Sequence, residues 1–127
     1  MNLTAIDPAL GQMGEFARAT GNVTAPVQKL REMTLLRDGA LPARIKTLAA
    51  LLWAVSSRCE PCIKFYAQKA RELGASDAEL GEMLALAPTM GACVAEMWAL
   101  KAFAAAKNPT EANQPPKGDD NAETCCV

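Results

Sequence analysis

The sequence predicts an all-α protein, and three observations lead to this prediction. Apolar residues recur at helical spacing along most of the chain, no segment is a candidate strand, and capping residues and prolines separate the periodic segments. Half of the 127 residues are hydrophobic, only 5% are aromatic, and alanine is abundant. We therefore expect close-packed helices around a modest core of small side chains.

Two helices are expected in the N-terminal part of the chain. Asp7 followed by Pro8 is typical of an N-cap and a first-turn proline, and opens a short helix that Gly21 closes. Thr24 and Pro26 indicate a second start. The apolar stripe of this second helix comprises Val27, Leu30, Met33 and Leu36, and the sequence RDGAL ends it.

The third helix is expected from about Pro42 to Ser56 and is apolar almost all round, which is typical of a helix in the core or in a subunit interface. The fourth is expected from Pro61 to Gly74. Its start is placed there because Glu60 precedes a proline and is pushed away from the helical region.

Two further helices complete the predicted bundle of about six. Ser76 and Glu79 have the spacing of a capping box and open a fifth helix, which Pro88 is expected to break. The last helix is expected from about Met90 to Ala106.

The helices are grouped into one domain over residues 1–107. Residues 108–127 are rich in Pro, Asn and Asp without apolar periodicity, and are expected to be a disordered tail. The net charge of −1 creates no field that would attract nucleic acid or an anionic membrane. No signal peptide is recognised, and the longest apolar run, LAALLWAV, is far shorter than the ~20 residues of a membrane span. We expect a cytoplasmic protein.

The stretch RCEPCIKFY, residues 58–66, carries the chemistry that stands out. The chain has five cysteines and no histidine, so proton transfer or metal binding must use Cys, Tyr, Lys or carboxylates. A helix that starts at Pro61 places Cys62 in its first turn, where free N–H groups and the helix dipole favour a thiolate. Cys59 can fold back within disulfide reach, and Tyr66 lies on the same helix face as Cys62.

Three interpretations of the pair stay open on the residues alone: a redox pair, half of a metal site, or two small core residues. A zinc site needs two further ligands, and Cys93, Cys125, Cys126 and the carboxylates stand at no recognisable spacing, so we expect no zinc. Cys93, among apolar neighbours, is expected to be a buried core residue.

The run CEPCIKFYAQKARELGASDAELGEMLALAPTMG resembles the carboxymuconolactone decarboxylase and alkyl hydroperoxidase D-like family, over roughly residues 26–106. The resemblance implies an all-helical fold, assembly into trimers or hexamers, and, in the branch with the cysteine pair, peroxidase or disulfide-reductase activity without a cofactor. It implies that Cys62 attacks a peroxide and becomes a sulfenic acid. Cys59 then forms the disulfide, which an external thiol reduces.

Two positions depart from the family pattern. Tyr66 stands where the family has a histidine, and Thr47, twelve residues before Cys59, stands where the family often has a glutamate. The resemblance places these two side chains in the proton relay around the cysteines. Tyrosine is a poor base at neutral pH but a good hydrogen-bond donor, so we expect disulfide exchange with weak peroxide turnover.

Two other functions remain as alternatives. Cys125 and Cys126 are adjacent thiols near the end of the expected tail, and thiolates select soft metals such as Hg, As or Cu, so the chain is alternatively a soft-metal binding or delivery protein. The second alternative is a catalytically inert oligomeric relative.

Overall fold

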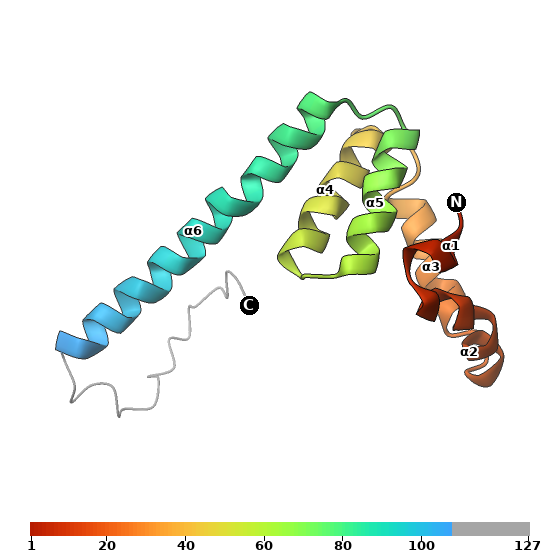
Figure 1. Ribbon diagram of the computed structural model, residues 1–127, viewed down its shortest axis with the longest axis horizontal. Helices are drawn as coiled ribbons and strands as arrows, with labels where there is room; N and C mark the ends of the chain where they lie inside the picture. The colour runs from red at the N-terminus through yellow and green to blue at the C-terminus, as the bar shows by residue number, and fades with distance from the viewer. Residues whose placement is uncertain (108–127) are drawn as a thin grey trace. The chain divides into compact units, whose positions relative to one another are not determined.

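The structure is a computed structural model that describes residues 1–107. The chain divides into two compact units, Met1–Thr89 and Met90–Val127, and each is taken by itself. All regular elements of the described residues are helical, which confirms the predicted fold class (Figure 1). They are α1 (Leu3–Ile6), the 3-10 helix η1 (Pro8–Gln12), α2 (Met13–Ala19), α3 (Thr24–Thr34), α4 (Ala43–Ser56), α5 (Glu60–Glu72) and α6 (Asp77–Lys107).

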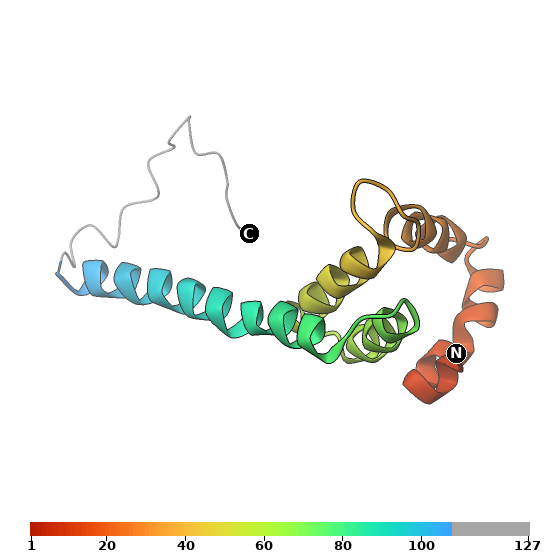
Figure 2. The same ribbon diagram turned by 90° about the horizontal axis from the view of Figure 1, so that it is seen from above.

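The helices α4 and α5 form an antiparallel pair that carries most of the core of the first unit (Figures 1 and 2). Leu48 in α4 packs with Ala70 in α5 and with Ala75, and the first turns of α6 add Leu80 and Met83 to this cluster. The buried residues of the unit are Ile6, Ala43, Thr47, Leu48, Leu51, Ala54, Ala70 and Ala75. Alanine is prominent among them, as expected for a core of small side chains.

The N-terminal elements differ from the single helix that the sequence predicted. Asp7 does cap the turn that begins at Pro8, since its carboxylate accepts a hydrogen bond from the Ala9 N–H at 2.8 Å. The helix is nevertheless divided into η1 and α2, and α1 precedes it unpredicted. Asn2 caps α1, a short element with too few residues to show a period in the sequence.

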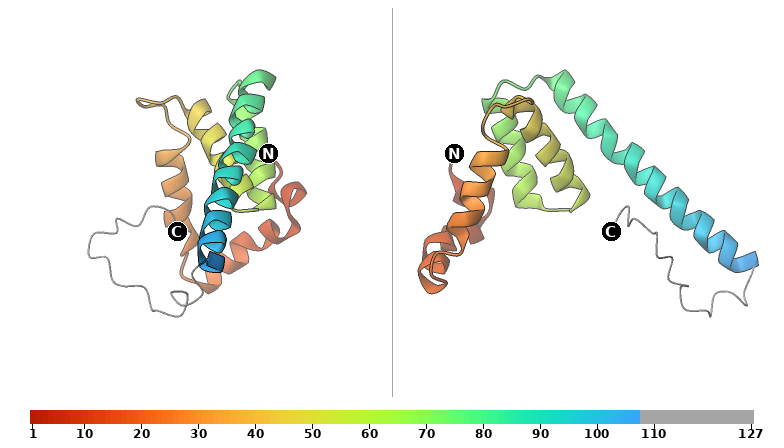
Figure 3. Two further views of the ribbon diagram at one scale, coloured as in Figure 1. Left: turned by 90° about the vertical axis from the view of Figure 1, so that its left-hand side faces the viewer. Right: turned by 180° about the vertical axis from the view of Figure 1, so that it is seen from behind.

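The turn between α2 and α3 uses two left-handed residues. Gly21 has a φ of 63° and Asn22 a φ of 66°, and asparagine is among the residues that tolerate this conformation best. The Asn22 N–H donates to the carbonyl of Ala17 at 2.7 Å, which closes the turn. Figure 3 follows the chain from the red N-terminal helices through this turn to α3 in orange.

The predicted break at Pro88 is wrong, because α6 is one helix from Asp77 to Lys107 with Pro88 inside it. A proline removes one backbone hydrogen bond and crowds the carbonyl four residues before it, which is why a break was expected. Strong helix formers such as Ala, Leu and Met stand on both sides of Pro88, and the Thr89 hydroxyl donates to the Ala85 carbonyl at 3.0 Å. The boundary between the two compact units follows at Thr89–Met90.

The described part of the second unit, residues 90–107, presents large apolar side chains to its surroundings. Met90, Val94, Met97, Trp98, Leu100 and Phe103 are between 55% and 65% exposed. Cys93 is exposed as well, so its predicted burial is wrong: no other described element of this unit covers it. By length and composition, α6 qualifies as a helix able to cross a membrane, which the search for unbroken apolar runs did not anticipate.

Candidate redox site

The two cysteines of the motif lie where α4 turns into α5, and they form a disulfide. Their Cα atoms are 5.2 Å apart, within the range of ordinary disulfides. Arg58 takes a left-handed φ of 54° in the turn, and Cys59 follows in an extended conformation as the N-cap of α5. The Cys59 N–H donates to the Ala54 carbonyl at 3.0 Å and fixes the turn against the end of α4. The expected disulfide reach is thereby confirmed.

Cys62 lies in the first turn of α5, as the sequence predicted. The unpaired N–H groups and the positive end of the helix dipole at this position stabilise an anion, and therefore a thiolate once the disulfide is reduced. Glu60 and Lys64 form an ion pair at 3.0 Å, so that their opposite charges offset each other. Arg58 makes no ion pair among the described residues and leaves net positive charge in the turn.

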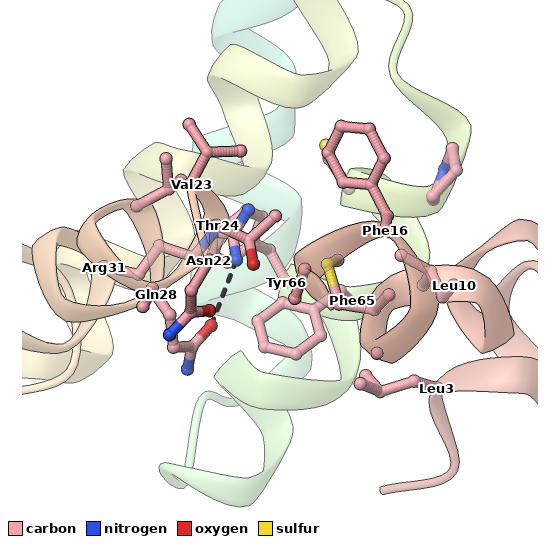
Figure 4. Close-up of a pocket in the computed structure, with 17 residues that line it drawn as sticks. Leu3, Leu10, Phe16, Asn22, Val23, Thr24, Gln28, Arg31, Phe65 and Tyr66 are labelled. Atoms are coloured by element: carbon pink, nitrogen blue, oxygen red, sulfur yellow. Dashed lines mark hydrogen bonds between the residues drawn. The ribbon is translucent and has the colours of Figure 1, made fainter. Parts of the chain in front are cut away.

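A cavity of about 760 Å³ adjoins the disulfide within the first unit (Figure 4). Its walls come from α1, η1, α2, α3 and α5, and are mainly apolar. Of the two cysteines, only Cys62 lines the cavity. A molecule held there therefore meets the sulfur of Cys62 before that of Cys59.

Tyr66 also lines the cavity, one helical turn after Cys62. Both side chains are half-buried, and the ring of Phe65 packs edge-on against Tyr66 with 5.1 Å between the ring centroids. No hydrogen bond is formed by the Tyr66 hydroxyl among the described residues. The tyrosine hydroxyl is thus available to a molecule in the cavity.

Thr47 has a different setting from the other proposed site residues. Its side chain is fully buried in α4, and its hydroxyl donates to the Ala43 carbonyl one turn earlier at 2.7 Å. Thr47 does not line the cavity beside Cys62. Its assignment to the proton relay remains a prediction, with the hydroxyl proton committed to the backbone in this structure.

The soft-metal alternative rests on Cys125 and Cys126, which lie outside the described residues. Within residues 1–107, no group of three or more potential metal ligands gathers at one place. The metal-binding role of the two tail cysteines therefore remains a sequence prediction.

The sequence reasoning missed the walls of the cavity. Phe16, Arg31 and Phe65 line it but were not singled out, and Val27 was noted only as part of an apolar stripe. The stripe was the available signal, because Val27, Leu30 and Met33 are 49% to 60% exposed and so do not serve as core. An apolar face that the chain's own core does not cover indicates a binding surface.

Comparison with known proteins relates this arrangement to a family. Residues 22–105 match the carboxymuconolactone decarboxylase family. The chain belongs to this family. An uncharacterized protein of Cupriavidus necator is 33% identical over 102 residues, which are 80% of this chain and 87% of that protein.

The family match includes α4, α5, the disulfide and α3, but not the helices before residue 22. This carboxymuconolactone decarboxylase family member therefore builds its cavity from two sources. The matched region supplies Cys62, Tyr66 and Arg31, and the preceding segment supplies the opposite wall with Leu3, Leu10 and Phe16. Family membership is consistent with either decarboxylase or peroxidase-like chemistry, and the residues of the cavity must decide between them.

Proposed function

We propose that the chain is a thiol–disulfide oxidoreductase that reduces peroxides through Cys59 and Cys62. The single observation that carries this proposal is the disulfide at the start of α5, with one of its sulfurs facing a cavity of small-molecule size. Two cysteines that pair in this geometry interconvert between dithiol and disulfide by exchange with other thiols.

The proposed reaction begins with the reduced pair. The Cys62 thiolate attacks one oxygen of a hydroperoxide, the O–O bond breaks, and the departing alkoxide takes a proton to become an alcohol. Cys62 is now a sulfenic acid. The Cys59 thiol then attacks its sulfur, the S–O bond breaks, and water leaves as the disulfide forms. The thiols have lost two electrons and the peroxide has gained them.

An external dithiol completes the cycle. It attacks the Cys59–Cys62 disulfide, passes through a mixed disulfide, and leaves as its own disulfide, while two protons return to the cysteines. Because such reductants are maintained in reducing compartments, we place the reaction in the cytoplasm.

Tyr66 is proposed to donate a hydrogen bond to the departing oxygen. It supplies a hydroxyl in the cavity close to Cys62, in a site without histidine. A tyrosine hydroxyl is almost fully protonated at neutral pH, so it acts as a donor and not as the base that ionises Cys62. Ionisation then depends on the start of α5, and we expect turnover slower than with an acid–base pair beside the thiol.

We also propose that copies of the chain associate. Large apolar side chains remain exposed on α3 and α6, including Val27, Met97 and Trp98. Since α6 lies almost entirely within the residues that match the family, we assign its apolar surface to contact with other copies and not to a lipid bilayer. Trp53, 70% exposed on α4, belongs to the same proposed contact surface.

The function is tested by peroxide consumption with dithiothreitol as the reductant. The wild-type chain is expected to consume peroxide catalytically, Cys62→Ser to be inactive, and Cys59→Ser to react once per chain in the absence of reductant. Cys93→Ser is the matched control and keeps full activity, since Cys93 lies outside the cavity. Equal activity of Cys62→Ser and wild type would overturn the proposal, and absence of turnover in every variant would support an inert relative.

A further inference from the structure

The cavity beside Cys62 combines an apolar body with one charged group. Leu3, Leu10 and Phe16 form one side, Gln28 and Arg31 lie on the other, and Phe65 and Tyr66 lie between them (Figure 4). Arg31 is the one charged side chain among the residues that line the cavity. The volume of about 760 Å³ is large for hydrogen peroxide and lies within the range of sites that hold organic molecules.

Arg31 is set up to receive an anion. Its guanidinium donates a hydrogen bond to the Gln28 amide oxygen at 3.1 Å, and Gln28 in turn donates to Glu32 at 3.2 Å. No carboxylate pairs directly with Arg31 among the described residues. The remaining N–H groups of the guanidinium are therefore available, in the fork geometry that matches a carboxylate.

The apolar wall is held in place by contacts to α5. Lys64 donates a hydrogen bond to the Ile6 carbonyl at 3.4 Å, and Ile6 itself is buried. The N-terminal helices are thus attached to the helix that carries Cys62. They form a wall for the site, although they lie before the region that matches the family.

We propose that this cavity binds amphipathic organic anions, with the carboxylate at Arg31 and the hydrocarbon chain against Phe16 and its neighbours. As a statement about substrate, the inference rests on the proposed function: the preferred peroxides are hydroperoxides of long-chain carboxylic acids. Charge complementarity selects this occupant, since a neutral alkyl hydroperoxide leaves Arg31 unpaired and a small peroxide leaves the apolar wall without contacts.

A binding experiment tests the cavity without requiring any reaction. Dodecanoate and its methyl ester are titrated into the full-length, disulfide-bonded protein, and binding is followed by calorimetry. Arg31→Gln is expected to weaken dodecanoate about fivefold, the effect of one ion pair near a surface, and to leave the ester unchanged. Phe16→Ala is expected to weaken both ligands alike.

Two variants serve as matched controls. Lys29→Gln removes a positive charge from the same helix α3 at a position outside the cavity, and is expected to bind both ligands as wild type does. Arg31→Lys keeps the charge and is expected to keep the preference for the acid over the ester. Equal loss of dodecanoate binding in Lys29→Gln and Arg31→Gln would overturn the proposal, because it would indicate a general charge effect.

A turnover experiment separates this inference from the proposed function. Linoleic acid hydroperoxide and its methyl ester are compared as substrates, and wild type is expected to prefer the acid, a preference that Arg31→Gln removes. Turnover of both peroxides at equal kcat/KM would overturn the inference and leave the redox function standing. Selective dodecanoate binding without any turnover would support the cavity's ligand class and overturn the peroxidase assignment.

A second copy of the chain is the competing occupant. If it fills the cavity, the affinity for dodecanoate will fall as the protein concentration rises through the range of association, and the proposal will be overturned. An affinity that is independent of protein concentration supports a cavity open to small molecules.

Discussion

Cys62 and Tyr66 lie one helical turn apart in α5 and line the same cavity. This relationship follows from the i,i+4 spacing of the sequence, and it places a hydroxyl donor beside the sulfur that faces the cavity. Tyr66→Phe removes the hydroxyl but keeps the ring that packs against Phe65. We expect kcat/KM for peroxide to fall about fivefold, the effect of one lost hydrogen bond, with the thermal midpoint nearly unchanged.

The converse change is Tyr66→His, which restores the residue type that the family pattern has at this position. We expect turnover to rise above that of wild type, because imidazole both accepts and donates a proton near neutral pH. Peroxide consumption at several pH values checks both variants. Wild-type activity in Tyr66→Phe would show that the hydroxyl has no part in the reaction.

The two cysteines at positions 62 and 93 offer an internal comparison of thiol reactivity. After reduction, Cys62 lies at the start of α5, whereas Cys93 is exposed within α6 without a helix end nearby. We expect iodoacetamide to modify Cys62 about fivefold faster than Cys93 at mildly acidic pH, since the helix end enriches the thiolate. Mass spectrometry of the reduced Cys59→Ser variant measures both rates. Faster modification of the more exposed Cys93 would contradict the role given to the helix start.

Glu79 makes stability depend on pH. The Ser76 backbone N–H donates to its carboxylate at 2.9 Å, and this bond, helped by the Ser76 hydroxyl and the Arg44 guanidinium, lowers the pKa of Glu79 below its ordinary value of 4.5 despite partial burial. A lowered folded pKa stabilises the fold above pH 4.5, and the contribution is lost as the pH falls through the folded pKa.

Glu79→Gln keeps an acceptor for the Ser76 N–H and removes only the charge. We expect the variant to be less stable than wild type at neutral pH, with the difference shrinking in acid. Thermal unfolding across the pH range measures this. Glu82→Gln, on the same helix and without an ion pair among the described residues, is the control. A constant difference between Glu79→Gln and wild type at every pH would contradict the linkage.

Association through α6 is open to a direct test. Val94 is 58% exposed on an apolar surface of that helix, and an aspartate there would carry a charge into any contact between copies. We expect Val94→Asp to shift the protein to monomers in sedimentation velocity. Leu41→Asp makes the same chemical change at a residue that is 57% exposed outside the helices, and is expected to leave the association intact. A wild-type chain that stays monomeric at all concentrations would rule the assembly out.

Local signals in the sequence predicted much of the site. Pro61 placed a helix start beside the cysteines, and Ser76 with Glu79 forms the capping box that the spacing indicated. These features depend on neighbours within a few residues, so they can be read from sequence alone. Pro88 failed as a signal because a single helix-breaking residue was outweighed by strong helix formers on both sides.

The cavity was beyond such reasoning. Its walls join residues near the N-terminus with Cys62 and Tyr66, which are far away along the chain, and no local period reports that contact. The exposure of Cys93 was missed for a related reason, since apolar neighbours in sequence do not show whether another element covers them. Thr47 was placed near the site by a family position, and its burial against Ala43 depends on the packing of α4.

The central claim is that the sulfur of Cys62 reacts with peroxide. The most direct measurement traps the intermediate: reduced Cys59→Ser protein is mixed with one equivalent of hydroperoxide and dimedone, and the modified residue is mapped by mass spectrometry. We predict a dimedone adduct at Cys62, formed before any at Cys93. An adduct at Cys93 alone, or unmodified Cys62 after the peroxide is consumed, would contradict the account.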